Sequence, residues 1–416
     1  MNLRCLLVLA LAGTCGVVPL GRAAEPLRLE AAVARALDSN PTLAAEAAQL
    51  DAVEARAQRE SLPPPYVVGG EFENAAGTGT LSGADSAETT LRISRVFELG
   101  GKRAARQALG NAEMTRQRNL AETARIDIAS RTTARFIEVV ADQQRLAYAR
   151  ERVEQAERTR REVASWVSAG RNPESDLRAA EIAAVDAELE REHAEHELAS
   201  ARMTLAASWG ALVPDFDTAA GDLAALPTVE PFETLAARLP MSTEQRAALL
   251  EAETIAARRR VAEATAKPDI NVSLGVRRLE AFDDHGLVMS VSVPLGSKVR
   301  AGYSVTEADA QLAALEARRN AERFERHQAL FEKYQELNHA RTEVESLRTR
   351  VLPKAEQALS FTRRGFDAGR FSFAALAQAQ KTLFGLRERA VDAAARYHLL
   401  LVEVERLTAV ATESSP

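Results

Sequence analysis

The sequence contains an internal repeat, and this repeat restricts the possible folds more than any other feature. The run Leu-Gly-Gly-Lys at residues 99–102 returns as Leu-Gly-Ser-Lys at residues 295–298. The run Ala-Gly-Arg at residues 169–171 returns at residues 368–370. In each half, the two runs enclose a long stretch with helical periodicity and few glycines or prolines. A duplicated unit of this length predicts a repeated scaffold rather than a single catalytic pocket.

The N-terminus has the features of a secretory signal peptide. Arg4 supplies a positive charge, residues 6–11 form a short apolar core, and residues 21–23 (Gly-Arg-Ala) resemble a cleavage site. We expect residues 1–23 to be removed, so that the mature chain begins near Ala24. A second possibility is a lipoprotein that is cut at Cys15. Both cysteines of the sequence lie in this segment, so we expect no disulfide in the mature chain.

Charge and hydropathy restrict the partners. Removing residues 1–23 removes two basic residues and no acid, which changes the formal net charge from −6 to −8. A mildly acidic chain argues against nucleic acid as a partner. No later stretch approaches the roughly 20 apolar residues of a membrane-spanning helix. Any contact with a membrane is therefore expected to be made by strands or by a lipid anchor.

The first half of the chain predicts a helix, two strands, a long helix and a shorter helix. Residues 102–168 contain one glycine and no proline, and predict a single rod of roughly 100 Å. The predicted elements are a helix over 30–61 broken at residues 40–41, strands over 66–74 and 90–97 around a loop over 75–88, the rod over 102–168, and a helix over 173–209.

The second half predicts the same order of elements. The heptad positions Val139, Leu146 and Val153 recur 198 residues later as Leu337, Val344 and Val351, so the expected packing seam is duplicated. Pro353 is expected to bend the second long helix, because proline removes a helical hydrogen bond. The predicted elements are a helix over 234–266 broken at Pro240, strands over 270–277 and 287–293 with a loop over 279–286, a long helix over 299–368, and a last helix over 372–409.

The strands predict a membrane barrel made by several copies of the chain. Each strand has about 8–9 residues, which is near the 9–11 residues that a tilted strand needs to cross a bilayer. Only closed barrels are stable in lipid, and four strands cannot close one. Three copies would supply twelve strands, with the rods projecting into the periplasm. We expect Val272, Leu274, Met289 and Val291 to face lipid and Ser273 to face the interior. The alternative is an ordinary strand pair in a soluble coiled-coil protein.

These features resemble the TolC-type outer-membrane efflux family over residues 28–410. The most specific runs are Phe-Glu-Leu-Gly-Gly-Lys-Arg at 97–103, Val-Pro-Leu-Gly at 293–296 and Phe-Asp-Ala-Gly at 366–369. The first of these is similar to the branch that serves cobalt–zinc–cadmium exporters. The resemblance implies a mainly α-helical homotrimer with a 12-stranded β-barrel over a helical tunnel. It also implies docking to a periplasmic adaptor (membrane fusion) protein and to an inner-membrane pump of the resistance–nodulation–division (RND) class.

The sequence carries no enzyme motif, and we expect no catalytic activity and no cofactor. Residues 99–102 lack the spacing of a phosphate-binding loop. They and their repeat are better interpreted as barrel-to-helix corners, formed by Gly100, Gly101, Lys102, Gly296 and Lys298. His193 and His196 lie on one helical face and are weak candidates for a metal site. An ordinary solvated polar face is the simpler interpretation. Trp166 and Trp209 are expected to pack near helix ends.

The two helix-to-helix turns, at Gly170 and Gly369, are expected at the far end of the rods. In the family, an acid six residues after the first turn glycine helps to hold this end shut, and that position here is Asp176. The second turn departs from the family pattern, because Ala375 and Gln378 stand where acids often form a constriction. The hypothesis is that Asp176 pairs with Arg171 or Arg370 across neighbouring hairpins. The alternative is an acid that merely favours the start of a helix.

The sequence thus predicts a passive duct across the outer membrane and periplasm, bounded by outer-membrane lipid and used for divalent heavy-metal cations. The alternatives are a duct for organic toxicants and a non-pore periplasmic coiled-coil adaptor or structural protein. The expected organisation is a signal peptide at 1–23, a first repeat at 24–213, a linker at 214–231, a second repeat at 232–410 and a tail at 411–416.

Overall fold

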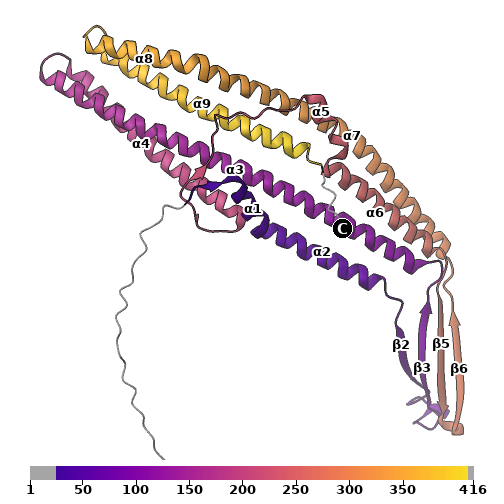
Figure 1. Cartoon of the computed structure of the whole chain (residues 1–416). Coiled ribbons are helices and arrows are strands. Elements are labelled where there is room, and N and C mark those ends of the chain that lie inside the picture. Colours follow the sequence, from indigo (N-terminus) through magenta and orange to yellow (C-terminus); the bar gives the residue numbers. More distant parts are fainter. Residues whose placement is uncertain (1–24, 411–416) are drawn as a thin grey trace, which may run out of the picture.

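The computed structural model describes residues 25–410. The expected signal peptide with Cys15 and the expected tail at 411–416 lie outside these residues. The described chain is an elongated helical body with a small sheet at one end (Figure 1). Two helix-to-helix turns lie at the opposite end of the body, as far from the sheet as the molecule extends (Figure 1).

The elements of the first half follow the predicted order. Asn40 separates the first two helices, and its side chain accepts a hydrogen bond from the backbone N–H of Thr42 at 2.8 Å, which caps the second helix. The elements are α1 (Leu29–Ser39), α2 (Pro41–Glu60), β2 (Tyr66–Glu73), η1 (Gly79–Leu81), β3 (Glu88–Phe97), α3 (Lys102–Ser168), α4 (Glu174–Ala206) and η2 (Ala207–Trp209).

The second half repeats this order with two differences. Its first helix is split more strongly, because Pro240 lies within a short 3₁₀ turn, and its long helix contains a π-helical turn. The elements are α5 (Phe232–Ala236), η3 (Leu239–Met241), α6 (Thr243–Thr265), β5 (Ile270–Leu279), η4 (Glu280–Phe282), β6 (Asp284–Ser292), α7 (Ser297–Ser346), the π turn η5 (Leu347–Val351), α8 (Leu352–Asp367) and α9 (Phe373–Leu407).

The β6 strand begins earlier than the sequence predicts. The expected loop over 279–286 shrinks to a tight connection, in which Asp283 adopts a left-handed conformation with φ of 53°. Because this turn is short, residues 284–286 pair with β5 as well. A second element was not predicted at all: β1 (Leu27–Arg28) pairs in parallel with β4 (Ala219–Ala220), which attaches the N-terminal end to the linker between the repeats.

The main sheet has the order β2-β3-β5-β6 and is antiparallel throughout. Leu274 lies opposite Ile93 on β3 and Met289 on β6. Ser273 lies opposite Ser94 and Ser290. Since residues opposite each other share a face of the sheet, the predicted alternation of an apolar and a polar face is confirmed.

The long helices form the body. The α3 helix contains 67 residues, as predicted, and is about 100 Å long. On its predicted seam, Val139 and Leu146 are buried, and their counterparts Leu337 and Val344 are buried on α7. Side by side, the helices run in the order α4, α3, α9 and α8 towards the turns, and α2, α3, α6 and α7 towards the sheet (Figure 1).

Next to Pro353, where the sequence predicts a bend, the long helix contains the π turn η5. In a regular α-helix the ring of Pro353 would clash with the carbonyl of the residue four positions earlier. That residue lies in η5, where the backbone widens immediately before the proline. The proline is therefore accommodated by a local bulge rather than by a break in the helix.

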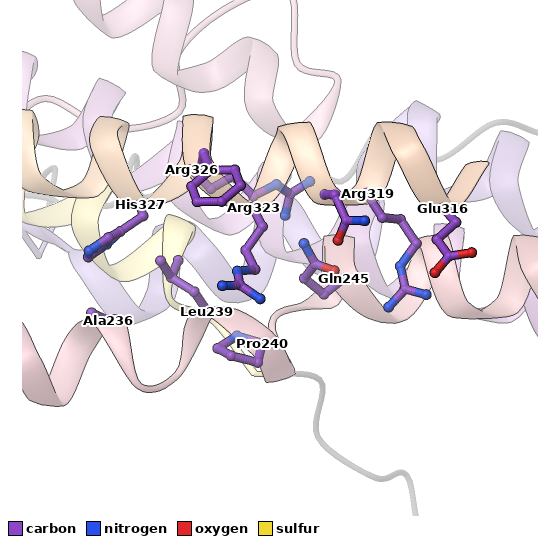
Figure 2. A pocket seen from close by; sticks show the side chains of 11 residues that line it. Ala236, Leu239, Pro240, Gln245, Glu316, Arg319, Arg323, Arg326 and His327 are labelled. Atoms are coloured by element: carbon purple, nitrogen blue, oxygen red, sulfur yellow. The ribbon is translucent and has the colours of Figure 1, made fainter. Parts of the chain in front are cut away.

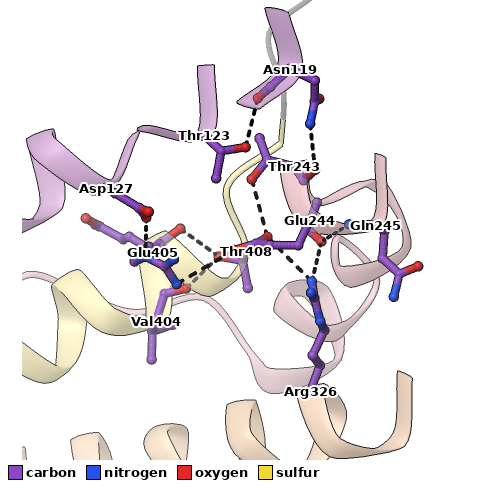
Figure 3. Close-up of polar contacts among 12 residues, drawn as sticks. Asn119, Thr123, Asp127, Thr243, Glu244, Gln245, Arg326, Val404, Glu405 and Thr408 are labelled. Atoms are coloured by element: carbon purple, nitrogen blue, oxygen red, sulfur yellow. Dashed lines mark hydrogen bonds and ion pairs between the residues drawn. The ribbon is translucent and has the colours of Figure 1, made fainter. Parts of the chain in front are cut away.

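Polar contacts join the helices of the two repeats. Arg406 Nε on α9 donates to Asp127 Oδ1 on α3 at 2.6 Å. Arg326 on α7 lies 3.5 Å from the carboxylate of Glu244 on α6. Asn119 on α3 donates to the backbone oxygen of Thr243. Figure 3 shows these contacts converging where α3, α6, α7 and α9 meet, which fixes the four helices relative to one another.

Candidate functional site

The two corners between sheet and helix depend on glycines in left-handed conformations. Gly100 and Gly101, between β3 and α3, have φ of 83° and 75°. Gly296, between β6 and α7, has φ of 85°. A Cβ on Gly100 would lie only 2.8 Å from the backbone oxygen of Ala264, so this position also lacks room for a side chain. Glycine is therefore required at Gly100 by backbone conformation and by close packing.

The first corner is fastened by an ion pair that has no equivalent in the second. Lys102 is 8% exposed, and its Nζ donates to Asp269 Oδ1 at 2.6 Å. The same oxygen accepts a hydrogen bond from the backbone N–H of Leu99. Asp269 thus joins the end of α6 to the start of α3. Lys298, the counterpart of Lys102, is exposed, and within residues 25–410 it makes no ion pair.

The two turns at the far end share one hydrogen-bonding pattern. Gly170 and Gly369 have φ of 71° and 68°. Arg171 N–H donates to the Trp166 oxygen, and Arg370 N–H donates to the Gly365 oxygen, each at 2.8 Å. These bonds complete a Schellman motif at the end of each helix. The repeat visible in the sequence is therefore reproduced in individual backbone hydrogen bonds.

Aromatic packing joins the two turns within one chain. The rings of Trp166 on α3 and Phe366 on α8 lie 4.7 Å apart between centroids. Phe366 also packs against Phe373 on α9, and both phenylalanines are buried. Beside this cluster, Arg363 on α8 forms an ion pair with Glu162 on α3. Trp166 packs as the sequence predicts. The sequence does not single out Arg363 or Glu162, because neither belongs to a repeated run.

The structure places the expected gate residues in two groups. Asp176 accepts a hydrogen bond from Asn172 Nδ2 at 2.9 Å, and within the described residues it makes no ion pair. The guanidinium of Arg171 instead stacks on Trp166, 5.0 Å from the ring centroid. Asp176 and Gln378 line one groove of about 380 Å³ between α4 and α9. A single chain therefore brings Asp176 close to Gln378 but pairs it with neither Arg171 nor Arg370.

The two candidate histidines lie on the exposed side of α4. His193 contacts Glu197 at 3.1 Å, and His196 contacts Glu192 at 3.7 Å, each pair on the same helix. No group of three or more His, Cys, Asp or Glu side chains able to hold a metal ion occurs among residues 25–410. These contacts fit the polar-face interpretation better than a dedicated metal cage.

The groove beside these histidines contains acids from neighbouring helices. It has a volume of about 790 Å³ and includes Glu138 and Asp142 of α3 and Asp392 of α9. Burial raises the pKa of Glu138 and of Asp142. Arg145 opposes this shift for Asp142, since its guanidinium donates to the Asp142 carboxylate. The arginine therefore compensates the acids that would otherwise attract a cation.

A second groove, of about 600 Å³, lies between α7 and the start of α6. Figure 2 shows Arg319 and Arg323 extending from α7 towards the segment that carries Pro240 and Gln245. Within the described chain, neither arginine makes an ion pair, and the Arg319 Nε is buried without a hydrogen-bond partner. Glu316 is the one acid in the lining, so this groove is basic.

Among residues 25–410, the structure contains no helix with the length and apolar character needed to cross a bilayer.

Comparisons with known proteins agree with the fold described above. Residues 32–211 match the family model described as outer membrane efflux protein. The cobalt-zinc-cadmium resistance protein CzcC of Cupriavidus metallidurans is 31% identical over 388 residues, which cover 92% of this chain and 90% of CzcC.

Two solved structures have the same fold along nearly their whole length. A membrane protein from Pseudomonas aeruginosa superposes with a TM-score of 0.77 at 15% identity, covering 93% of this chain and 91% of that chain. CusC, whose structures are described in terms of folding and transmembrane channel formation, superposes with a TM-score of 0.76 at 13% identity. That match covers 95% of this chain and 96% of CusC.

Proposed function

Because the chain belongs to the outer membrane efflux protein family, we propose that three copies of it form a passive export duct for divalent heavy-metal cations. The protein is an outer-membrane efflux channel whose helical part lies in the periplasm. This excludes the non-pore coiled-coil alternative raised by the sequence. The family is one of efflux proteins rather than enzymes, in agreement with the absence of catalytic motifs from the sequence.

The free edges of the sheet support the trimer. In the described sheet, β2 and β6 each pair with a strand on one side only. The backbone N–H and C=O groups on their outer edges therefore need hydrogen-bond partners within the bilayer. Joining the β6 edge of one copy to the β2 edge of the next satisfies both sets of groups. Three copies of this sheet provide twelve strands, which is within the range of closed membrane barrels.

An apolar stripe on α4 supports the same assembly in the helical part. Ile182, Val185 and Leu189 are 70%, 62% and 59% exposed. They lie on the side of α4 opposite to its buried alanines, which contact α3. This stripe therefore points away from its own chain. At the other edge of the chain, α8 presents Phe361, which is 60% exposed, so both edges offer apolar surface to a neighbour.

The similarity to CzcC carries the assignment of heavy-metal cations. It extends over nine-tenths of both chains, and CzcC is named for cobalt, zinc and cadmium resistance. A duct needs no metal cage of its own, because selection can be made by the pump that fills it. We therefore propose that an inner-membrane pump of the RND class delivers the cations to the duct through a periplasmic adaptor. Outer-membrane lipid would surround the apolar face of the sheet.

Growth in the presence of toxic metals tests the cargo. A strain that lacks the gene is compared with the same strain complemented by the wild-type chain. We expect the deletion to increase sensitivity to cobalt, zinc and cadmium salts, with little effect on organic toxicants. Increased sensitivity to organic toxicants alone would overturn the metal assignment in favour of the second duct hypothesis.

The far end of the helical body is the proposed periplasmic gate, formed by Gly170, Arg171, Asp176, Gly369, Arg370 and Gln378. Among the side chains of residues 25–410, the Asp176 carboxylate accepts a hydrogen bond only from Asn172, so it retains capacity for an arginine of an adjacent copy. Each exposed pair would contribute about 0–1 kcal/mol, and three symmetric pairs act together on one opening.

Planar-bilayer recordings test this gate. Asp176→Ala is expected to raise the resting conductance, because the opening loses three stabilising contacts. Glu174→Ala is the matched control: Glu174 lies in the same first turn of α4, but it pairs with Arg178 on its own helix. An unchanged conductance for Asp176→Ala would leave this acid as a helix-start residue.

A further inference from the structure

The polar face of the sheet carries six charged side chains that none of the roles above explains. They lie in register with the face that contains Ser273, opposite to the apolar face that contains Leu274, and they are Glu71, Glu73, Glu88, Arg92, Arg277 and Asp284. In a membrane barrel the apolar face contacts lipid and the polar face lines the interior. These six side chains therefore face the lumen of the proposed duct.

Arg277 on β5 organises the first group of charges. Its Nη1 donates to Glu88 at 2.6 Å, and its Nη2 donates to Glu73 at 3.2 Å. Its Nε donates to the hydroxyl of Thr90, which is almost fully buried. Glu88 also accepts a hydrogen bond from Asn74. Because each group has several partners, this guanidinium and its two carboxylates have fixed positions.

Arg92 on β3 forms the second group with Glu71, at 3.2 Å. Two glycines lie beside it, and they make space for its side chain. A Cβ on Gly275 would lie 2.9 Å from the Arg92 Cβ, and a Cβ on Gly69 would lie 3.7 Å from the Arg92 Nε. The Arg92 side chain can therefore lie along the barrel wall. The side chains of Arg92 and Glu71 are 48% and 38% exposed, so both charges remain accessible to the lumen.

We propose that these six residues form a charge filter that makes the barrel prefer cations. This inference rests on the proposed trimeric duct and assigns a selectivity element within it. Four carboxylates face two guanidiniums in each chain, so each copy leaves two uncompensated negative charges and the trimer leaves six. Fixed charges on a water-filled, low-dielectric wall concentrate counterions. A net negative wall therefore favours cations.

The Arg92–Glu71 pair sets the strength of the filter. The Arg277 group is more enclosed, since the side chains of Arg277 and Glu88 are 31% and 21% exposed. Arg92 and Glu71 are more exposed, so removal of either charge changes the wall without breaking a buried network. Screening limits the effect in salt, because the Debye length is about 10 Å at 0.1 M. Selectivity should therefore increase as the salt concentration falls.

Reversal potentials of the reconstituted full chain in a KCl gradient test the filter. Arg92→Gln raises the net wall charge of the trimer from six to nine negative charges, and the cation-to-anion permeability ratio should rise about 1.5-fold at low salt. Glu71→Gln lowers the net wall charge to three negative charges, and the preference for cations should fall by about half. Glu71→Arg leaves no net charge on the wall, and the preference for cations should disappear.

Arg278→Gln is the matched control. It removes the same charge as Arg92→Gln, but from β5, at the position next to Arg277. Arg278 lies on the opposite face of the sheet and pairs with Glu280. Its selectivity should match that of the wild type. Equal selectivity in all four variants, in channels of normal conductance, would overturn the filter and leave the duct intact. Absence of any channel from the wild-type protein would instead overturn the proposed duct.

Discussion

At the scale of single residues, the corners between sheet and helix are the most constrained positions. Gly100 and Gly101 are adjacent and both left-handed, but they differ in their surroundings. A Cβ on Gly100 would meet Ala264 and Lys267, whereas a Cβ on Gly101 would meet nothing within 4 Å. The repeated run in the sequence identified the corner. The sequence could not distinguish the two glycines, because the contact of Gly100 comes from α6.

Substituting each glycine by alanine separates conformation from packing. Gly101→Ala should cost about 1–2 kcal/mol, the penalty of a left-handed alanine. Gly100→Ala should cost about 2–4 kcal/mol, because a clash with the α6 backbone adds to that penalty. Thermal unfolding of the purified variants, followed by circular dichroism, measures the difference. Equal losses would show that the loop relaxes away from Ala264.

His398 on α9 predicts a dependence of stability on pH. Burial lowers the pKa of His398, and its Nε2 lies 3.2 Å from the backbone oxygen of Leu223 in the linker. The unfolded chain therefore binds this proton more readily than the folded chain. Stability from the neutral ring is complete above the unfolded pKa of about 6.5 and is lost progressively as the pH falls from there through the lower folded pKa.

The matched variant for this effect is His398→Gln, which keeps a donor for Leu223 and does not titrate. Between about pH 7.5 and about pH 5.5, the melting temperature of the wild type should fall relative to that of the variant. Comparing the two proteins cancels the contributions of Glu138, Asp142 and Glu405, whose pKa values are raised by burial. Parallel curves would show that His398 has no part in the pH response.

At the scale of elements, the hydrophobic periodicity of the sequence correctly predicted which of the main segments are helices and which are strands. The alternation along 270–277 predicted a two-faced strand, and the register of β5 with β3 and β6 confirms it. The long α3 was predicted to the residue, since its ends are marked by glycines and its interior contains no proline. The π turn was not predicted, because Pro353 indicates a disruption but not how the backbone absorbs it.

Arginine substitutions on adjacent residues of β5 test the two faces. Leu274→Arg should impair insertion by roughly 2–4 kcal/mol if the residue lies near the bilayer midplane, because a charge on the lipid face is costly. Ser273→Arg should insert normally and change conductance, since it lies on the polar face. Recovery of each variant in outer-membrane fractions gives the comparison. Equal damage from both would refute the assignment of the faces.

At the scale of the whole molecule, a single chain leaves backbone groups and apolar side chains without partners. Its sheet has two unpaired edges, and α4 and α8 present exposed apolar side chains at opposite edges of the body (Figure 1). Such surface is typical of an obligate assembly. The proposed trimer therefore completes the barrel and the helical part through the same pair of edges.

The fraction of the protein that runs as heat-resistant trimers in outer-membrane extracts measures this assembly. Val185→Asp should reduce the resistant fraction strongly, because it would bury an unpaired charge between copies. Val185→Leu keeps the apolar stripe and should preserve the trimer. Full heat resistance of Val185→Asp would place the stripe outside the contact between copies.

The sequence alone determined the duplicated plan, the order and type of the main helices and strands, and the two turns, because these depend on local periodicity and on glycine and proline. It also identified the family, through runs that lie at the corners and turns. Only the tertiary structure decided which distant side chains meet. Lys102 with Asp269, Trp166 with Phe366, and Arg277 with Glu73 and Glu88 come from separate elements. Their contacts depend on how the two repeats pack side by side, and no local pattern in the sequence encodes that packing.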